Sequence, residues 1–344
     1  MSDKPDKAEE ADSGNSARTA SDKEADPGRR KYRVRRILLI SLGSLLALAI
    51  AATVGIYAYV NHVASSIPRV HVGNLTRPGA GSEETFLIIG SPSEPTGTAV
   101  QSVPQGYSKL IMLLHINANG RTGGVVGMPA DAMVNVPGVG TKPLWYALKV
   151  GGPSLLVLTV RELTGVPINH FAAIDLDHLT RLIDAIGGVD VTLSAASSSS
   201  GHTFTAGVNH LTGITAVYYA RDPSLTDEGR MLREENLLRA ILIKIADDHL
   251  LTHPITGLRV LNAITSTLTV DSNFTNSEIE SLARKLGNLG GGAATFVAAP
   301  TRTVDGRLVL NMAVADQLWA AVKKNSIANF ATAFPSTVEP QVVP

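Results

Sequence analysis

Three arginines lie close together in a chain that is otherwise poor in charge. The segment ARDPSLTDEGRMLREENLLRA (220–240) contains Arg221, Arg230 and Arg233, whereas only 17% of the whole chain is charged. Arg230 and Arg233 are three residues apart, so their side chains would be neighbours on the surface of a helix. A guanidinium group binds phosphate oxygens through two parallel hydrogen bonds. One interpretation of this segment is therefore a phosphate-binding site.

The same segment can also be interpreted as a solvated helix face. Glu234 follows Arg230 by four residues, and Arg239 follows Glu235 by four, which suits exposed ion pairs. Such pairs contribute little to stability. Spacing alone favours this second interpretation but does not exclude the first.

Sequence motifs for other kinds of catalytic or metal site are absent after residue 61. The patterns GxxxxGK[ST], HExxH and GxSxG are absent there, and the nine histidines lack metal-ligand spacing. The chain has no cysteine, which excludes disulfides, thiolate catalysis and cysteine-based zinc sites. Beyond residue 36 there are 20 Lys and Arg against 22 Asp and Glu, a net charge of −2. A nucleic-acid-binding protein needs a basic face, so this class is disfavoured.

Residues 37–60, ILLISLGSLLALAIAATVGIYAYV, contain no charged side chain. As a helix these 24 residues span about 36 Å, enough to cross a hydrocarbon core of roughly 30 Å. Six of the eight residues from Arg29 to Arg36 are basic, which places residues 1–36 in the cytoplasm. A cleaved signal peptide would have a shorter apolar region nearer the start, and a buried soluble helix is rarely charge-free over this length. We expect a single-pass cell-membrane protein whose main domain is extracytoplasmic.

Three further segments are predicted to lie outside the folded domain. Residues 1–28 have almost no large apolar side chain and are predicted to be disordered, as part of a cytoplasmic tail. Residues 61–82 are polar, with Pro and Gly, and are predicted to form a stalk. Residues 326–344 are predicted to form a flexible tail.

Strands and helices alternate along residues 83–325. The predicted strands are 85–90, 109–117, 123–129, 171–176, 189–193 and 294–300. The predicted helices are 153–164, 177–188, 207–221, 229–247, 255–270, 277–289 and 314–325. This alternation predicts one α/β domain, an α–β–α layered sandwich with a mixed central sheet.

Two blocks of this domain resemble the LytR–CpsA–Psr family of membrane-anchored cell-envelope proteins. Residues 151–193 are similar to the family's helix ending in ELTG, its next strand and its helix ending in GGVDV. Residues 203–241 are similar to a family pattern that contains YvR and then D.GR..RQ. TFLIIGS, KLIMLLHIN and MPADAMVNVPGVGTKPLWYAL fill the remaining positions in the family's order. The resemblance covers about residues 83–325, preceded by the family's usual tail, basic flank and anchor.

The resemblance implies transfer of an anionic glycopolymer from a polyprenyl-pyrophosphate carrier to peptidoglycan during cell wall biogenesis. It also implies a hydrophobic pocket for the lipid and a magnesium ion at the pyrophosphate. Such chemistry needs cations on the phosphate oxygens and carboxylates on the metal. The implied partners are the membrane, the carrier-linked polymer and peptidoglycan, with other family members as further partners and no nucleic acid.

The resemblance assigns roles to individual residues. Arg230 and Arg233 match the paired arginines near the pyrophosphate and are the candidate catalytic residues. Two aspartates match family positions that support the site. The implied pyrophosphate site consists of Arg221, Arg230, Arg233 and Lys142, supported by Asp131 and Asp227.

Several positions depart from the family pattern. Pro92 and Lys109 stand where acids are expected, so the metal ligands are unknown and a magnesium site is in doubt. Lys109 is a candidate to bind the pyrophosphate directly instead. The family's phosphate-binding arginine, glutamine and asparagine are replaced by Ala130, Glu234 and Leu144.

Two hypotheses follow from this mixture of retained and replaced residues. The first is a working or weakened glycopolymer transferase. The second is a catalytically impaired family member that binds polyprenyl-phosphate lipid or wall polymer as an accessory protein. A transcriptional attenuator is disfavoured, because the folded domain is expected outside and the inner tail is short and balanced in charge.

Overall fold

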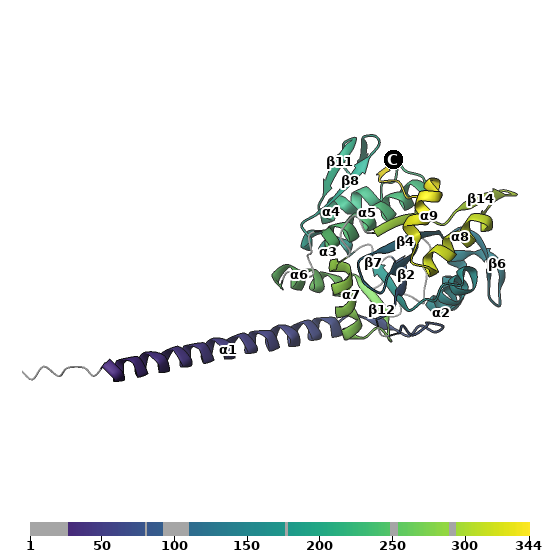
Figure 1. Ribbon diagram of the computed structural model, residues 1–344. Helices are drawn as coiled ribbons and strands as arrows, with labels where there is room; N and C mark the ends of the chain where they lie inside the picture. The colour runs from purple at the N-terminus through teal and green to yellow at the C-terminus, as the bar shows by residue number, and fades with distance from the viewer. Residues whose placement is uncertain (1–26, 80, 92–109, 176–177, 248–253, 289–293) are drawn as a thin grey trace, which may run out of the picture. The chain divides into compact units, whose positions relative to one another are not determined.

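A computed structural model describes residues 27–79, 81–91, 110–175, 178–247, 254–288 and 294–344. The chain divides into two units, Met1–Tyr57 and Ala58–Pro344. Helix α1 (Pro27–Ser65) supplies the described part of the first unit and the beginning of the second (Figure 1). The segment predicted to be disordered, residues 1–28, lies almost entirely outside the described residues.

The apolar part of α1 is suited to a lipid environment. Residues Ile40–Ser65 contain an 18-residue stretch with a mean hydropathy of 2.0 and are long and apolar enough to cross a membrane. Large side chains such as Leu42, Leu45 and Leu48 are more than 60% exposed. Exposed apolar surface of this kind is costly in water. The helix therefore fits the predicted membrane anchor.

The centre of the second unit is a seven-stranded mixed sheet with the order β1-β12-β7-β2-β3-β4-β13. The pairs β1–β12, β2–β7 and β4–β13 are parallel, and the other pairs are antiparallel. The strands are β1 (Arg69–Val70), β2 (Glu84–Ser91), β3 (Leu110–Ile116), β4 (Gly123–Pro129), β7 (His170–Asp175), β12 (Leu268–Asp271) and β13 (Ala294–Ala298). The predicted mixed central sheet is confirmed.

Strand β3 shows why the sheet is covered on both faces. Every residue of LIMLLHI is buried. Alternate side chains of a strand point to opposite faces, so Leu110, Met112 and Leu114 join one hydrophobic cluster while Ile111 and Leu113 join the other. Each cluster is completed by helices.

Helices lie on both faces of the sheet, which confirms the predicted α–β–α layers (Figure 1). One face packs against α3 (Leu179–Ala185), α4 (Gly213–Ala220), α5 (Asp227–Asp247), α6 (Pro254–Thr265) and α7 (Asn276–Asn288). The other packs against α2 (Leu144–Thr164), α8 (Met312–Lys323) and α9 (Ile327–Ala333).

Three smaller sheets surround this sandwich. Their orders are β11-β8-β16, β10-β9 and β14-β15-β5-β6. The strands are β5 (Met133–Val136), β6 (Gly140–Pro143), β8 (Val189–Leu193), β9 (Ser197–Ser199), β10 (His202–Phe204), β11 (Gly207–Leu211), β14 (Thr301–Val304), β15 (Arg307–Leu310) and β16 (Val342–Val343).

In two predicted helices, part of the segment forms a strand instead. In 207–221 the first residues form β11, and α4 starts only after Thr212, whose capping box with Thr215 defines the helix start. In 255–270 the helix α6 ends at Thr265, and β12 then pairs between β1 and β7. In both cases pairing with a distant strand overrides the local helical pattern.

The predicted stalk is part of the domain. Within 61–82, Val63, Ala64 and Ile67 are at most 5% exposed, and β1 pairs with β12. Arg69 also donates to Asn276 Oδ1 at 2.7 Å. The prediction was wrong because the few apolar residues of this polar segment are buried in the core of the domain.

The predicted flexible tail is also folded. Residues 326–344 form α9, a 3-10 turn (Pro335–Thr337) and β16. Ile327, Phe330 and Val343 are at most 5% exposed. The tail is fixed by burying these side chains, an outcome that requires partners remote in sequence.

Candidate functional site

Four strands of the central sheet each have one terminus at the same end of the sheet, which we call the site edge. β2 ends at Ser91, β4 at Pro129 and β7 at Asp175, whereas β3 begins at Leu110. The register pairs Ser91 with Asp175 and Leu110 with Pro129. The departures from the family pattern at Pro92, Lys109 and Ala130 lie in the segments GSPSE (90–94), YSKL (107–110) and PAD (129–131), which adjoin these strand ends. The fold therefore brings the flanks of all three motifs to the same edge.

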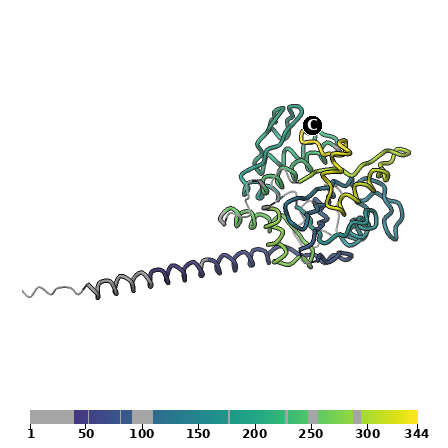
Figure 2. The backbone as a smooth tube through the Cα atoms, in the orientation of Figure 1, coloured from purple at the N-terminus to yellow at the C-terminus, as the bar shows by residue number. Residues whose placement is uncertain are grey.

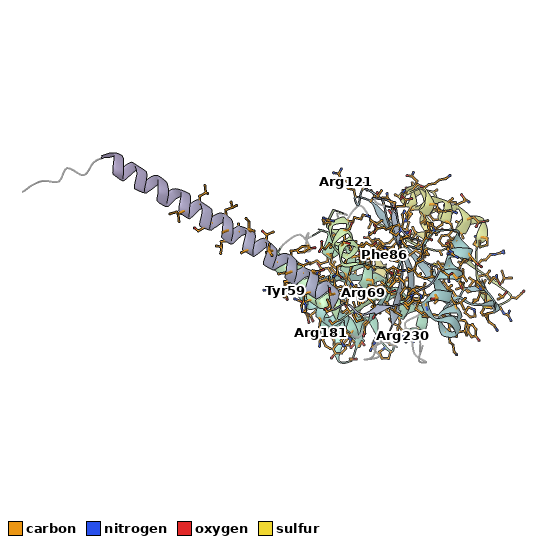
Figure 3. The ribbon with its side chains drawn as sticks, turned by 90° about the horizontal axis from the view of Figure 1, so that it is seen from below. Tyr59, Arg69, Phe86, Arg121, Arg181 and Arg230 are labelled. Atoms are coloured by element: carbon orange, nitrogen blue, oxygen red, sulfur yellow. The ribbon has the colours of Figure 1, made fainter. Side chains whose placement is uncertain are left out.

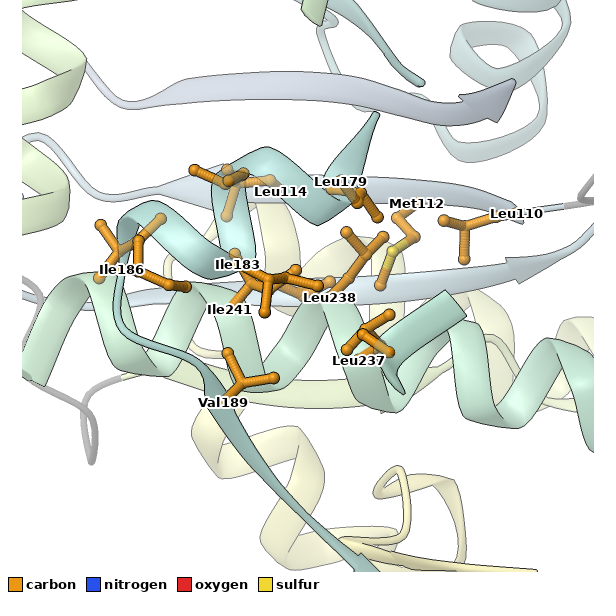
Figure 4. Packing of buried hydrophobic residues seen from close by; sticks show 14 of the residues in the cluster. Leu110, Met112, Leu114, Leu179, Ile183, Ile186, Val189, Leu237, Leu238 and Ile241 are labelled. Atoms are coloured by element: carbon orange, nitrogen blue, oxygen red, sulfur yellow. The ribbon is translucent and has the colours of Figure 1, made fainter. Parts of the chain in front are cut away.

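Helices α3 and α5 begin at this edge. In Figure 4, Leu179 of α3 and Leu237 of α5 lie on the side of Leu110, whereas Ile186 and Ile241 lie farther along β3. Because the lower-numbered residues lie near the start of β3, the N-terminal ends of both helices point toward the site edge. A helix N-terminus carries partial positive charge and favours anions.

A narrow pocket lies between α3, α4 and α5. Its volume is about 20 Å³, which is space for about one water molecule. Two charged side chains, Arg221 and Glu234, line it together with the apolar residues Leu179, Ile183, Ala216, Val217, Ala220 and Leu237. The pocket therefore combines an apolar lining with a cation and a carboxylate.

Arg221 and Arg230 lie at the surface of this region. Arg221 is the exposed C-cap of α4, and Arg230 is half-buried in the first turn of α5. The Nη1 of Arg230 donates to the carbonyl oxygen of Leu225 at 2.8 Å. In Figure 3, Arg230 and Arg121, which lies in the turn between β3 and β4, are at opposite edges of the domain. Arg230 is thus at the edge where the strand ends meet.

Arg233 differs from these two arginines because it is completely buried. It donates to the main-chain oxygens of Tyr219 (3.1 Å) and Pro344 (2.8 Å), to Asp222 Oδ2 (3.2 Å) and to Ser197 Oγ (2.9 Å). A buried guanidinium is stable only when paired in this manner. Contrary to the predicted role in phosphate binding, Arg233 binds the protein's own oxygens and has no exposed surface.

Asp222 connects Arg233 to the loop between α4 and α5. Its Oδ1 accepts hydrogen bonds from the N–H (3.0 Å) and hydroxyl (2.6 Å) of Ser224. Burial alone would raise the pKa of Asp222, but the Ser224 hydrogen bonds and the Arg233 charge outweigh it and hold the pKa below its usual value. The carboxylate is therefore ionised and fixes a loop flanked by Arg221 and Arg230.

Lys142 and Asp131 occupy a second exposed region next to the end of β4. Lys142 lies on β6, with Nζ 5.6 Å from the centre of the Tyr146 ring, and Asp131 Oδ1 accepts from Trp145 Nε1 at 3.1 Å. The N–H of Leu144 donates to the carbonyl of Ala132 at 3.0 Å and connects β6 to this turn. The predicted roles of Lys142 and Asp131 remain predictions.

Two departures from the family pattern are explained by packing. Ala130 and Leu144 are each 1% exposed and belong to the cluster that faces α2. A charged or amide side chain at either position would place a polar group among apolar ones, at a substantial cost. These residues are core residues here.

Pro92 and Lys109 lie outside the described residues, as does the side chain of Asp227, the first residue of α5. Their predicted roles therefore stay predictions.

The magnesium ion that the family resemblance implies stays a prediction. The described residues contain no group of three or more His, Asp or Glu side chains that could hold a metal ion. At the site edge, Asp131 accepts a hydrogen bond from Trp145, and Asp175 is bonded to His178. We therefore derive no step through a metal.

The pair Asp175 and His178 was missed by the sequence-based reasoning. Asp175 Oδ2 is 2.8 Å from His178 Nδ1, and the His178 side chain is 43% exposed. The next residue, Leu179, lines the pocket. An imidazole oriented by a carboxylate is suited to accept a proton. The spacing D-x-x-H at the end of a predicted strand was the available signal.

The family model of the LytR_cpsA_psr family matches residues 60–324. The chain belongs to this family. It is 29% identical over 222 residues to the polyisoprenyl-teichoic acid–peptidoglycan teichoic acid transferase TagU of Bacillus mycoides (strain KBAB4), a match that covers 61% of this chain and 71% of TagU. The resemblance inferred from the motifs is thereby confirmed.

Two other proteins extend the comparison. The probable cell wall biosynthesis protein LcpB of Corynebacterium glutamicum is 28% identical over 258 residues, covering 71% of this chain and 62% of LcpB. The structure of TagT bound to LIIa-WTA is similar with a TM-score of 0.57 and 19% identity, covering 76% of this chain and all of TagT. At that identity the structural likeness shows the family fold.

Proposed function

We propose that this protein transfers an anionic glycopolymer from a polyprenyl-pyrophosphate carrier to peptidoglycan. The observation that carries the proposal is the pocket between α3, α4 and α5, where Arg221 adjoins an apolar lining. An amphiphile with an anionic head and a hydrocarbon chain requires this combination. The names of TagU and of TagT bound to LIIa-WTA describe proteins that act on or bind teichoic acid, which supports the same class of substrate.

The lipid chain would occupy an enlarged form of this pocket. A volume of about 20 Å³ does not hold a prenyl chain. The lining side chains Ala216, Val217 and Ala220 of α4 are small. We therefore place the lipid between the three helices, which separate to admit it.

In the proposed reaction, Arg221 and Arg230 bind the oxygens of the pyrophosphate. A hydroxyl oxygen of the acceptor attacks the phosphorus that carries the glycopolymer. The bond from that phosphorus to the bridging oxygen breaks, and polyprenyl phosphate leaves with the bond's electron pair. The proton of the hydroxyl passes to His178, which Asp175 orients. The arginines stabilise the charge on the leaving phosphate.

The test is a transfer assay with the full chain in detergent, carrier-linked glycopolymer and a peptidoglycan acceptor. Arg230→Ala should lower the transfer rate by about 100-fold, because it removes a cation from the reacting phosphate. Arg284→Ala, an exposed arginine of α7, is the matched control and should retain the rate. An unchanged rate in Arg230→Ala would exclude this arginine from the site.

A second candidate function is binding of the carrier lipid without turnover. It is favoured by Glu234, whose carboxylate lines the same pocket as Arg221 and would repel a pyrophosphate. In that case the chain would retain polyprenyl phosphate during purification yet release no product in the transfer assay. It would then act with other members of the family.

We also propose that the protein is a single-pass cell-membrane protein with its N-terminus in the cytoplasm. The apolar segment of α1 and the basic residues that precede it support this orientation. A reporter enzyme that is active only outside the membrane, fused to the C-terminus, should be active in cells. An inactive reporter, with an N-terminal fusion active instead, would reverse the orientation.

A further inference from the structure

The C-terminal residues 338–344 cross three elements of the domain and lie beyond the family match, which ends at residue 324. We call them the C-terminal strap. At one end the strap is bonded to β13, where the N–H of Glu339 donates to the carbonyl of Phe296 at 3.1 Å. At the other end Val342 and Val343 pair in parallel with β8 (Figure 2). Between these strands the strap runs along α5.

One face of α5 holds the strap by its main chain. Arg233 Nε donates to the main-chain oxygen of Pro344 at 2.8 Å, Asn236 Nδ2 to that of Gln341 at 3.3 Å, and Arg239 Nη1 to that of Glu339 at 3.0 Å. The three donors follow one another at intervals of three residues, so they lie on one face of the helix. The residues that accept these bonds decrease in number, from Pro344 to Glu339, as the donors increase, so the strap runs antiparallel to α5. The strap is therefore bonded along about two turns of α5.

The same helix face is connected to the candidate site. Arg233 binds the strap on one side and Asp222 on the other, and Asp222 fixes the loop between Arg221 and Arg230. Arg230 itself is three residues before Arg233 on α5. A displacement of the strap would thus move the two arginines of the site.

We propose that the strap sets the position of α5, and that Arg233, Asn236 and Arg239 are positioning residues acting through it on Arg221 and Arg230. Arg233 does not touch the substrate in this arrangement. Its four hydrogen bonds instead hold the strap, the α4–α5 loop and Ser197 together. The effect on ligand binding rests on the proposed function, whereas the effect on α5 does not.

A pair of buried carboxyl groups makes this contact sensitive to pH. Glu235 of α5 and Glu339 of the strap are 9% and 5% exposed. A methyl group on Gly127 of β4 would lie 2.7 Å from Glu339 Oε1 and 3.2 Å from Glu235 Oε1, so both carboxyls converge on this glycine. Glu339 Oε1 has no hydrogen-bond partner. The space between strap, α5 and β4 thus contains two acids at close range.

Burial, and then the nearby carboxyl groups, favour the protonated form of this pair. Burial, and then the neighbouring Glu234, raise the pKa of Glu235 to about 7. Burial, and then Glu235, raise the pKa of Glu339 to about 8, although Arg239 and the Gly127 N–H oppose the shift. Both values lie above those of an unfolded chain. The contact is therefore most stable below the unfolded values near 4.5, and it weakens as the pH rises toward 8.

The test measures hydrogen exchange of the full chain in detergent, together with binding of farnesyl pyrophosphate as a soluble probe. Arg239→Met retains most of the aliphatic side chain but removes the bond to the strap. It should speed exchange in β16 and in the first turns of α5 about tenfold, because a charged hydrogen bond is lost. It should also weaken probe binding severalfold. Arg284→Met on α7 is the matched control.

Glu339→Gln supplies an independent test, since Gln resembles the protonated acid. After correction for intrinsic exchange rates, strap protection in the wild type should fall between pH 5 and pH 8. In Glu339→Gln it should fall less, because only Glu235 of the pair still titrates. If Arg239→Met exchanges like Arg284→Met, or if Glu339→Gln keeps the wild-type pH profile, the strap does not control α5. If exchange changes as expected but the wild type fails to bind the probe, the proposal about the strap is supported and the proposed function is contradicted.

Discussion

The two faces of the central sheet bury polar groups in different ways. On the α2 face, buried Thr159 and Thr164 donate to carbonyls of their own helix at 2.7 and 2.8 Å. On the α5 face, buried Arg233 connects Asp222, Ser197 and the strap, which come from separate segments. The hydrogen bonds of these threonines thus stay within one helix, whereas those of Arg233 join several elements. The candidate site lies on the second face.

This difference predicts which substitutions will lower the stability of the protein most. A buried ion that joins elements is costly to remove because its partners are left unpaired. A buried apolar side chain costs its transfer free energy and a cavity. Substitutions on the two faces should therefore differ in what they cost.

Arg233→Met should lower the free energy of unfolding by about 3–5 kcal/mol, because it leaves Asp222 buried without a cation. The measurement is urea unfolding of the full chain in detergent, followed by fluorescence of the two tryptophans, both of which lie in the second unit. Arg230→Met is the control and should cost less than about 1 kcal/mol. Equal losses in the two variants would remove the distinction between the buried and the surface arginine.

Leu156→Ala, on the α2 face, should cost about 3 kcal/mol, since Leu156 is fully buried. Binding of farnesyl pyrophosphate by the folded fraction should not change, because this face does not contribute to the pocket. Weaker binding at equal folded concentration would show that the two faces are coupled.

Stability should decrease as the pH rises from 5 to 8. The folded pKa values of Glu235 and Glu339 lie above those of the unfolded chain, so the folded state binds more protons across this range. Urea unfolding at a series of pH values measures the slope, and Glu339→Gln should reduce it. A profile that is flat or rises with pH would contradict the shared protonation of the pair.

Glu234→Gln should have the smallest effect, a two- to fivefold gain in affinity for farnesyl pyrophosphate, about 0.5–1 kcal/mol. The change removes a negative charge from the pocket that contains Arg221. Titration calorimetry at low salt measures it, and added salt should diminish the gain. A loss of affinity would instead assign Glu234 a favourable contact with the ligand.

Much of the fold could be predicted from local patterns. The hydrophobic runs of β2, β3, β4 and β7 and the periodic apolar residues of α5 identified the layers in advance. The strands β1, β12 and β16 were missed because they are only two to four residues long and acquire their conformation by pairing with distant strands. Register and long-range pairing leave little signal in so short a segment.

The environment of the arginines could be predicted only in part, for a related reason. The spacing of Arg233 from Arg230 did not reveal that one is buried and the other reaches the surface. Neighbours on a helix differ in burial according to what packs against each side chain. The relevant partner here, the strap, lies more than 100 residues away in sequence.

By itself the sequence determined the apolar span, the α/β class, the family and the arginine-rich helix, because composition, periodicity and motif spacing are local properties. Only the tertiary structure decided which arginine faces the pocket, which one joins the core and what covers α5. Those outcomes depend on the burial of charges, and burial is set by contacts between segments that are distant along the chain.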